Sequence, residues 1–413
     1  MGRGGPRGCS AAGYAGCWML LKAALLLDGT DRPAVHDAAL DVGPDGRIVA
    51  VGRAADVAGA RADVLDLGPA CLLPGLIDLH GHLRLSHLEP EPAKQVHDSE
   101  PTYVARAIEH LQTNLTSGVT TMRCNGDRDF LDVRLREQVA AGALAGPRLL
   151  VATRGIKSPS CTGGMVATVL VDGESAIAAA VADNARQGAD HIKIFTSGGL
   201  GPPATATQLP WSAAEIRAAV EAAHAAGLPI VAHCHGGPSA RALIEAGVDS
   251  LEHGSYLSPA ELEAMAQRGT VLDMTLGILL DARSVAHQHL QAQLGTAGFA
   301  RLCDEVLATM RRAVALGVRI TLGTDTMHGL LSVEAQALAD LGVAPAAVVQ
   351  TLTGRAAAVL GLADLTGTLR PGLAADVIAV AGDPLADLAT LAHPLLVMRG
   401  GRIVYTEGDV CGV

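Results

Sequence analysis

The chain has 413 residues, of which 49% are hydrophobic and 18% charged, so it can bury a large core and is not globally disordered. A net charge of −11, with no cluster of Lys and Arg and only 2% aromatic residues, argues against a nucleic-acid partner. No apolar run reaches the roughly 18 residues of a membrane span, so we expect no membrane partner. The 15 histidines outnumber Phe, Tyr and Trp combined, and we interpret some of them as ligands.

The N-terminal segment and the cysteines bear on where the protein resides. Residues 1–18 are rich in Gly, Ala and Arg, and we expect a disordered extension there. The apolar run that starts at Met19 is interrupted by Lys22 and is followed by an Asp28-Gly29 turn signal, so we interpret it as a first strand rather than a secretory signal. The eight cysteines form no CxxC pair, which predicts neither a disulfide framework nor a zinc knuckle and fits a cytoplasmic location.

Both ends of the chain are predicted to form short β-strands. Residues 19–75 contain alternating apolar runs, and Pro-Asp-Gly at 44–46 is a hairpin signal between two of them. The same pattern returns near the end of the chain, in GTLRPGLAADVIAV and LLVMRGGRIVYTEG. We therefore predict one small β-sandwich built from 19–75 and 361–413.

Residues 76–360 alternate short apolar runs with Ala-rich amphipathic segments. Helices are predicted over 174–187 and 212–226, the second opened by a capping box of Ser212 and Glu215. Repeated strand–helix units indicate parallel strands, and so many in one stretch favour a (β/α)8 TIM barrel over an open sheet. The predicted strands include 118–124, 146–153, 191–199, 228–236, 249–255 and 318–325.

Potential metal ligands lie in these strands, mostly at or near their C-terminal ends. His80 and His82 are two residues apart on one strand, so both imidazoles face the same side. Each ligand candidate alone has an ordinary structural explanation, but together they would meet at the rim where barrel enzymes build their active sites. The set is His80, His82, Lys193, His233, His253 and Asp325.

The chemistry of this set points to divalent metal ions. Imidazole and carboxylate groups suit Zn²⁺ or a similar ion. Lys193 lies inside the apolar run HIKIF, where a charged amine is expensive to bury. The lysine is explained if its amine is modified to a carbamate that serves as an anionic ligand between two metals.

At this point the sequence resembles a known family, the amidohydrolase superfamily of metal-dependent hydrolases. It is most similar to the subgroup of imidazolonepropionase-like and Xaa-Pro dipeptidase-like enzymes, which includes ochratoxin-hydrolysing amidases. The resemblance runs from about residue 19 to the end. It is carried by the motifs LLPGLIDLHGH, HIKIFTSGG, VAHCHG, SLEHGS, LGTDT and GTLRPGLAADVIAV.

The resemblance implies a binuclear centre with two divalent ions, for which we expect Zn²⁺. His80, His82 and Asp325 would hold the more buried ion. His233 and His253 would hold the other, and a carboxylated Lys193 would bridge the two. The 20-residue step between the latter two histidines favours His233 over His235 as the ligand and leaves His235 for substrate contact.

The expected reaction is hydrolysis of a C–N amide bond in a small molecule. Two cations lower the pKa of a shared water, and the resulting hydroxide attacks the carbonyl carbon. Asp325 accepts the water proton as general base and returns it to the leaving nitrogen as general acid. The expected substrates are small linear or cyclic amides, lactams and N-acyl or dipeptide-like metabolites.

Two positions depart from the pattern of the resembled enzymes. Dipeptidase-like members carry a carbonyl-polarising His where this chain has Met165, which can neither donate a hydrogen bond nor carry charge, so a dipeptidase is the weaker expectation. Arg84, in HGHLR, resembles an Arg that holds a substrate carboxylate in cyclic amidases, and we expect a carboxylate on the substrate. The donors that could replace the missing His are His235, Arg154, Lys157 and Tyr256.

Two other functions are weighed against amide hydrolysis. Ring deaminases of this superfamily typically use one metal, lack the strand lysine and carry a Glu soon after the third metal His. VAHCHGG lacks that Glu, and Lys193 is present. A catalytically inactive binding homologue would usually have lost ligands, whereas all six are present. From the resemblance we also expect a homo-oligomer.

Overall fold

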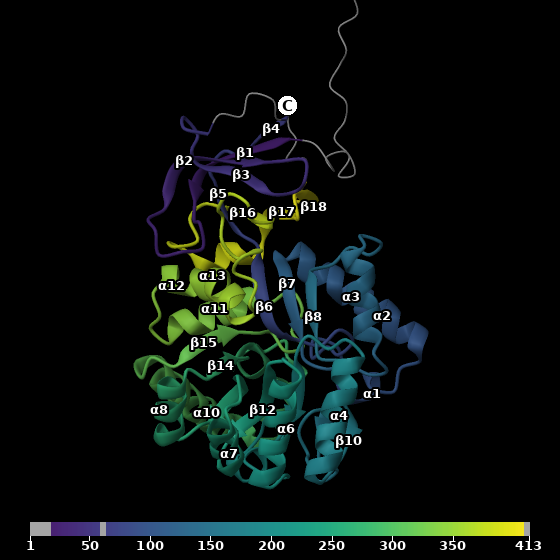
Figure 1. The fold of residues 1–413 in the computed structure, drawn as a ribbon. Helices are drawn as coiled ribbons and strands as arrows, with labels where there is room; N and C mark the ends of the chain where they lie inside the picture. The colour runs from purple at the N-terminus through teal and green to yellow at the C-terminus, as the bar shows by residue number, and fades with distance from the viewer. Residues whose placement is uncertain (1–17, 58–62, 409–413) are drawn as a thin grey trace, which may run out of the picture. The chain divides into compact units, whose positions relative to one another are not determined.

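The computed structural model describes residues 18–57 and 63–408 (Figure 1). The predicted extension over residues 1–18 therefore lies, apart from Trp18, outside the described residues. The chain divides into two compact units. Of the described residues, the first comprises those up to Ile77, Leu115–Thr120 and those from Pro345 onward, and the second comprises Asp78–Asn114 and Thr121–Ala344.

Strands from both ends of the chain share one sheet in the first unit. Its order is β18-β17-β16-β5-β1-β2-β3, with β4 paired to β1. The two ends meet where β5 and β16 pair antiparallel, with Pro74 opposite Val377. The sheet buries an apolar cluster that includes Leu40 and Leu396, whereas a second sheet that would make a sandwich stays a prediction. The strands are β1 Met19–Leu26, β2 Val35–Val42, β3 Ile48–Arg53, β4 Asp63–Asp66, β5 Ala70–Pro74, β16 Val377–Ala381, β17 Pro394–Arg399 and β18 Arg402–Thr406.

The hairpin predicted at 44–46 is confirmed. β2 and β3 pair antiparallel, with Val42 opposite Ile48. The turn between them closes with a hydrogen bond from Gly46 N to Gly43 O of 2.9 Å. Gly46 has φ of 76°, a left-handed conformation in which a β-carbon would lie 2.2 Å from the carbonyl oxygen of Gly400, so only glycine fits.

Parallel strands alternate with helices in the second unit, as predicted. One sheet has the order β10-β9-β11-β12-β13-β14-β15 and the other the order β6-β7-β8. Near the C-terminal end of β15, Asp325 forms a parallel bridge with Gly81 at the end of β6. The strands are β6 Leu76–Gly81, β7 Val119–Cys124, β8 Arg148–Val151, β9 Gly155–Lys157, β10 Ala167–Leu170, β11 Ile192–Phe195, β12 Ile230–Gly236, β13 Ser250–Tyr256, β14 Val271–Met274 and β15 Arg319–Leu322.

Local sequence features explain a helix start and a helix break. The capping box predicted for Ser212 and Glu215 is present at the start of α6. The helix α10 contains a break at Gly295, with φ of 67° and ψ of 165°. The helices are α1 Pro92–Gln95, α2 Glu100–Thr116, α3 Leu131–Ala140, α4 Glu174–Arg186, α5 Pro203–Ala206, α6 Ala213–Ala225, α7 Pro238–Ala246, α8 Pro259–Arg268, α9 Gly277–Leu280, α10 Val285–Ala315, α11 Leu331–Asp340, α12 Pro345–Thr351 and α13 Gly354–Val359, with a 3₁₀ helix at Leu388–Ala392.

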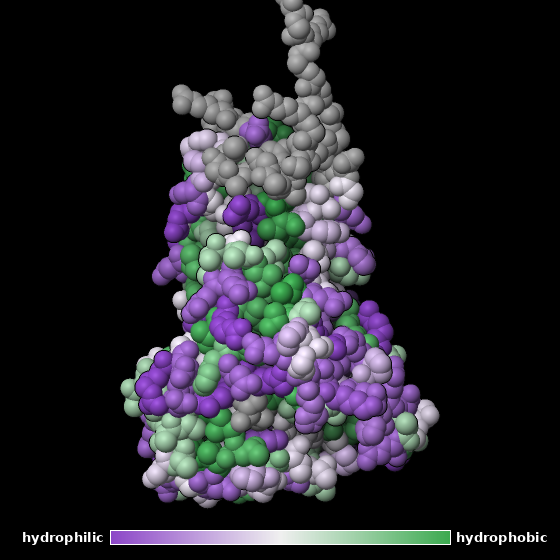
Figure 2. Space-filling view, turned by 90° about the vertical axis from the view of Figure 1, so that its right-hand side faces the viewer, coloured by the Kyte–Doolittle hydropathy of each residue, from purple (hydrophilic) through white to green (hydrophobic). Residues whose placement is uncertain are grey.

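The surface mixes hydrophilic and hydrophobic side chains (Figure 2). Exposed large apolar residues include Val64, Met165, Leu170 and Leu209. Among the described residues, the helices are too short or too polar to cross a membrane.

Candidate metal centre

The ends of five parallel strands place the predicted ligands. His80 is on β6, and His82 follows that strand directly. Lys193 is on β11, His233 on β12 and His253 on β13. Two residues separate Asp325 from the end of β15. We call these six residues, His80, His82, Lys193, His233, His253 and Asp325, the ligand cluster.

The histidines of the ligand cluster lie close to one another and to Asp325. Ring centroids are 5.0 Å apart for His80 and His253, and 4.5 Å apart for His233 and His253. The Nε2 of His82 lies 3.5 Å from Asp325 Oδ1, and that of His80 lies 3.9 Å from it. Ligand atoms of His80, His253 and Asp325 all lie within 4.8 Å of one another. The structure thus brings these residues together at a spacing that one or two metal ions can span.

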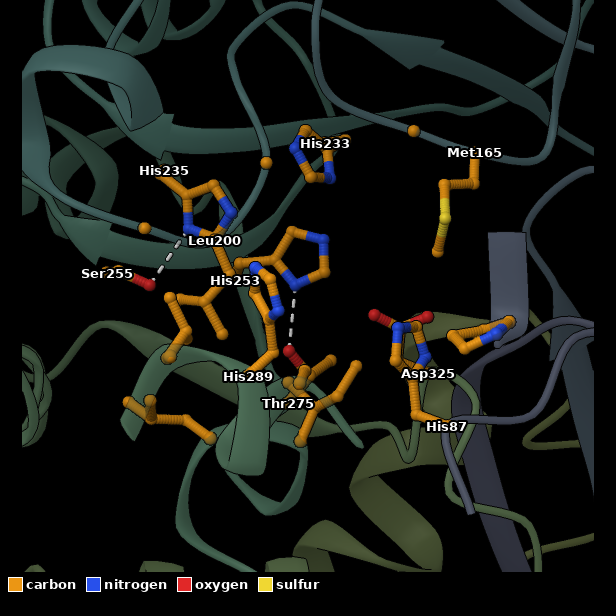
Figure 3. A pocket seen from close by; sticks show the side chains of 18 of the residues that line it. His87, Met165, Leu200, His233, His235, His253, Ser255, Thr275, His289 and Asp325 are labelled. Carbon is orange, nitrogen blue, oxygen red and sulfur yellow. Dashed lines mark hydrogen bonds between the residues drawn. The ribbon is translucent and has the colours of Figure 1, made fainter. Parts of the chain in front are cut away.

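Hydrogen bonds orient the imidazoles. His82 Nδ1 lies 3.1 Å from the carbonyl oxygen of Gly126, and His233 Nε2 lies 2.9 Å from that of Gly198. A carbonyl oxygen only accepts, so these nitrogens carry the hydrogen and donate. His82 Nε2 and His233 Nδ1 therefore keep their lone pairs for a metal. His253 Nδ1 contacts Thr275 Oγ1 at 2.8 Å, which leaves its Nε2 toward the cavity (Figure 3).

Burial keeps these imidazoles neutral, the form that binds metals. It is the largest cause that lowers the pKa of His80, His233 and His253 well below the usual value. The same cause lowers the pKa of His82 to about 3, and the nearby amine of Lys193 lowers it further.

Two residues of the ligand cluster have a strained backbone. His253 has φ of 73° and Asp325 has φ of 57°, in the left-handed region that non-glycine residues seldom adopt. Such conformations persist where the surrounding structure holds them, and they gather at functional sites. For Asp325 the restraint is visible, because its backbone N–H donates to the carbonyl oxygen of His80 at 2.6 Å.

Lys193 carries an unpartnered amine. Its side chain is fully buried, and its Nζ is among the described buried polar atoms that have no hydrogen-bond partner. Burial lowers the pKa of this amine to about 8, although the carboxylates of Glu252 and Asp325 act in the opposite direction. A buried amine without a partner is costly unless another group completes it. The donor set and this orphaned atom fit a carbamate between two divalent ions.

Asp325 is placed to move a proton. Its side chain keeps 16% of its surface exposed and lines a cavity of about 580 Å³. Burial raises the pKa of its carboxyl to about 7, against the opposing charge of Lys193. A carboxyl group that titrates near neutral pH suits both general-base and general-acid roles.

Two buried acids beneath the ligand cluster were missed by sequence reasoning. Glu252 Oε2 lies 2.8 Å from His80 Nδ1, and Asp273 Oδ2 lies 3.7 Å from the same atom. Glu252 accepts hydrogen bonds from Arg123 and Asn125, at 3.0 Å each. Because Arg123 already neutralises Glu252, we interpret these acids as supports that orient His80 rather than as ligands. The signal in the sequence was the acid directly before His253 in SLEH.

The four predicted substrate contacts divide into two pairs. Met165 and His235 line the cavity together with the ligand cluster histidines, and the thioether of Met165 points toward Asp325 (Figure 3). His235 Nδ1 contacts Ser255 Oγ at 2.9 Å. Arg84 and Tyr256 are not among the residues that line this cavity. The Tyr256 hydroxyl donates instead to the carbonyl oxygen of Gly201 at 2.7 Å.

The placement of Arg84 does not support its predicted role in binding a substrate carboxylate. Its guanidinium is buried, pairs with Asp127 at 3.2 Å and donates to the carbonyl oxygen of Gln95 at 3.1 Å. Of the other donors considered, Arg154 pairs with Asp183, and Lys157 donates to the carbonyl oxygens of Gly163 and Gly164. His235 is therefore the candidate that faces the cavity.

Comparison with known proteins agrees with this site. Residues 71–404 match the model of the Amidohydrolase family, and the chain belongs to that family, which confirms the predicted resemblance. The family generally uses divalent metals, and its solved members imply a TIM-barrel-like α/β fold for this chain.

Individual relatives act on different C–N bonds. The chain is 32% identical over 246 residues to ochratoxinase from Aspergillus niger, a match that covers 58% of this chain and 51% of that protein. The match thus spans about half the length of these first relatives. Imidazolonepropionase from Rhodococcus jostii is 27% identical over 397 residues and 88% of each chain. A solved Xaa-Pro dipeptidase with bound methionine superposes with a TM-score of 0.82 at 26% identity, over 94% of this chain and 100% of that one.

Proposed function

We propose that this protein is a binuclear metal-dependent amidohydrolase that cleaves the C–N amide bond of a small molecule. The observation that carries the proposal is the ligand cluster itself. Four neutral histidines, a carboxyl group with a raised pKa and an unpartnered buried amine converge at one end of the parallel strands. Membership in the family supports a hydrolase.

Each residue of the ligand cluster has a proposed task. His80, His82 and Asp325 would hold one ion, His233 and His253 the other, and carboxylated Lys193 would bridge them. Bound divalent ions, which we propose to be zinc, supply Lewis acidity that activates water and polarises the carbonyl. Asp325 takes the proton of the attacking water at its carboxylate and delivers it to the leaving nitrogen. His235 faces the same space with its Nε2 and would hydrogen-bond the carbonyl oxygen, a task that Met165 cannot perform.

We propose in addition that the parallel strands close into an eight-strand barrel. The strands would be β6, β7, β8, β11, β12, β13, β14 and β15. Support comes from the bridge between Gly81 and Asp325 on one side and from a hydrogen bond of 2.8 Å from Asp190 N to Val151 O on the other. Closure would direct all the carboxyl ends of the strands to one rim.

Two observations bear on which substrates and reactions stay candidates. The solved Xaa-Pro dipeptidase keeps dipeptides among the candidates. Deamination is disfavoured by the buried Lys193 on β11, since superfamily deaminases lack a lysine there.

A substrate screen with metal analysis tests the proposal. The protein is loaded with zinc in the presence of bicarbonate, which supplies the carbamate, and is assayed against dipeptides, N-acyl amino acids, acyl anilides, lactams and cyclic imides. We expect two ions per chain and hydrolysis of at least one amide class. A single ion per chain with release of ammonia from an aminated ring would favour a deaminase. Two ions without hydrolysis of any amide would contradict the proposal.

A further inference from the structure

The cavity that contains the ligand cluster has a second, apolar side. It is formed by residues from the loop before α9, from α9 and from α10. Leu279, Leu290 and Val306 are almost fully buried, with 2%, 4% and 1% of their surfaces exposed. We call the following residues the apolar wall: Leu276, Ile278, Leu279, Val285, Leu290 and Val306.

The apolar wall is held by specific polar contacts. Glu334 on α11 accepts from the backbone N–H groups of Leu276 at 2.8 Å and Gly277 at 2.5 Å. Buried Ser284 caps α10, and the Val285 N–H donates to the carbonyl oxygen of His87 at 2.8 Å. These bonds anchor the start of both helices. The wall is therefore a preformed surface, as small-molecule sites usually are.

One face of the first part of α10 is turned to the cavity. Val285, Ala286, His289, Leu290 and Gln293 all line it, and their spacing of three to four residues is that of a single helix face. The intervening Gln291 is exposed and does not line the cavity. The contrast provides a matched control position on the same helix.

No lysine or arginine is found among the described residues that line the cavity. The acidic group at its edge, Glu91, already pairs with Lys94 at 2.5 Å. A carboxylate placed against the apolar wall would lose its hydration without gaining a charged partner. An alkyl or aryl group there would gain from the removal of apolar surface from water.

We propose that the apolar wall binds an uncharged hydrocarbon or aromatic group of the substrate, so that the enzyme acts on neutral hydrophobic amides rather than on amides that carry a carboxylate. This inference rests on the proposed function, because it takes the ligand cluster as the place where the amide is cleaved. It replaces the carboxylate that the sequence suggested through Arg84.

Binding of matched hydroxamates tests the inference without turnover. Hydroxamates chelate divalent ions, so their alkyl tails extend from the ligand cluster. We would titrate zinc-loaded protein by calorimetry with acetohydroxamate, butanohydroxamate and octanohydroxamate, and with the analogue of octanohydroxamate whose chain ends in a carboxylate. We expect Kd to fall about three- to fourfold for each added methylene until the wall is covered. The carboxylate-ended analogue should bind about tenfold or more weaker than octanohydroxamate.

Variants test whether the apolar wall causes the gain in affinity with alkyl chain length. Ala286→Asp places a carboxylate at a half-buried lining position of α10, and we expect it to weaken octanohydroxamate about tenfold while acetohydroxamate binds as before. Gln291→Glu adds the same charge to the exposed face and should change neither. Leu290→Asp is the stronger form of the test where that variant folds.

The outcomes separate the inference from the proposed function. Acetohydroxamate that binds no better with zinc than without it would overturn the metal site and the inference together. Acetohydroxamate that binds, with no gain from longer chains or with equal affinity for the carboxylate-ended chain, would overturn the inference alone. In the corresponding kinetic test, octanoyl 4-nitroanilide should have a higher kcat/KM than the 4-nitroanilide whose octanoyl chain ends in a carboxylate, because both have the same leaving group. The reverse order would also overturn the inference while supporting amide hydrolysis.

Discussion

The ligand cluster and the apolar wall belong to one cavity but are built in different ways. The cluster comes from strand ends, and its imidazoles are fixed by carbonyl and hydroxyl groups such as Gly126 O and Thr275 Oγ1. The wall comes from helices α9 and α10, and its shape depends on backbone bonds to Glu334. Chemistry and selectivity are therefore separable here, and we expect mutations in the apolar wall to leave the ligand cluster intact, and the reverse.

The largest expected effect is that of Asp325→Asn on turnover. The amide cannot accept the proton of water, so we expect kcat to fall by about 10²–10⁴-fold. Octanohydroxamate should lose less binding affinity than its alkyl tail contributes, because the apolar wall that binds the tail is unchanged. Steady-state kinetics and calorimetry on the same preparation check this, and full activity of the variant would remove Asp325 from its proposed role.

Substitution of Glu252, which lies beside His80, should chiefly affect the stability of the protein. Glu252→Gln leaves buried Arg123 without its anionic partner at 3.0 Å, and we expect a loss of about 3–5 kcal/mol in the free energy of unfolding. Urea denaturation measures it. Because Arg123 also donates to the carbonyl oxygen of Leu79 at 2.6 Å, part of its hydrogen bonding survives. A change in the free energy of unfolding below about 1 kcal/mol would contradict this expectation and would mean that water solvates Arg123 in the variant.

Lys193→Met should separate stability from metal binding. Methionine fills a similar volume without a buried amine that lacks a partner, so the metal-free variant should be more stable than the wild type by about 1–3 kcal/mol. The same variant should hold fewer ions after zinc loading, since no carbamate can form. Thermal denaturation of the metal-free protein and elemental analysis of the loaded protein give the two readings. A variant that keeps two ions would contradict the bridging role.

The smallest expected effect concerns the pH dependence of the protein's stability, through Glu334, which accepts hydrogen bonds from the apolar wall. Burial raises the pKa of Glu334 to about 8, against the backbone N–H groups of Leu276 and Gly277, which lower it. An acid with a raised pKa binds its proton more tightly in the folded state, so its contribution is present below its usual pKa and is lost as pH rises through about 8. Glu334→Gln should therefore flatten the loss of stability between about pH 5 and pH 8.

Thermal denaturation over that pH range compares the variant with the metal-free wild type. Asp325→Asn serves as a second control, since the pKa of Asp325 is also raised, to about 7. Parallel curves for wild type and Glu334→Gln would show that Glu334 does not titrate in this range.

Much of the fold was readable from the sequence because local patterns reflect it. Alternation of short apolar runs with amphipathic segments predicted the parallel strands and helices of the second unit, and the hairpin signal at 44–46 was correct. The pairing of both chain ends in one sheet was also expected, although the sandwich stays a prediction. The ligand roles stay a prediction as well, but the structure places five of the six residues in the lining of one cavity, and the charge of buried Lys193 acts on His82 and Asp325.

Two features of the site depend on contacts between distant parts of the chain. Arg84 lies in a motif that suggests carboxylate binding, and its guanidinium pairs with Asp127, 43 residues further along the chain. Glu252 resembles an ordinary strand residue in the sequence, whereas in the fold it accepts hydrogen bonds from Arg123 and Asn125. Neither set of contacts can be predicted from a periodic pattern in the sequence, because the contacting residues come from different strands or loops.

Strand periodicity and ligand spacing are local properties of the chain, so the residue types that could do chemistry, and the strands that carry them, were predictable from the sequence. The charges that are already neutralised, and the surface that the cavity offers a substrate, could be read only from the fold. Those properties depend on contacts between residues far apart in the chain. Leu279, Leu290 and Val306 resemble any other core residues in the sequence, and their place in the lining of the same cavity as His253 and Asp325 makes them a candidate surface for substrate selection.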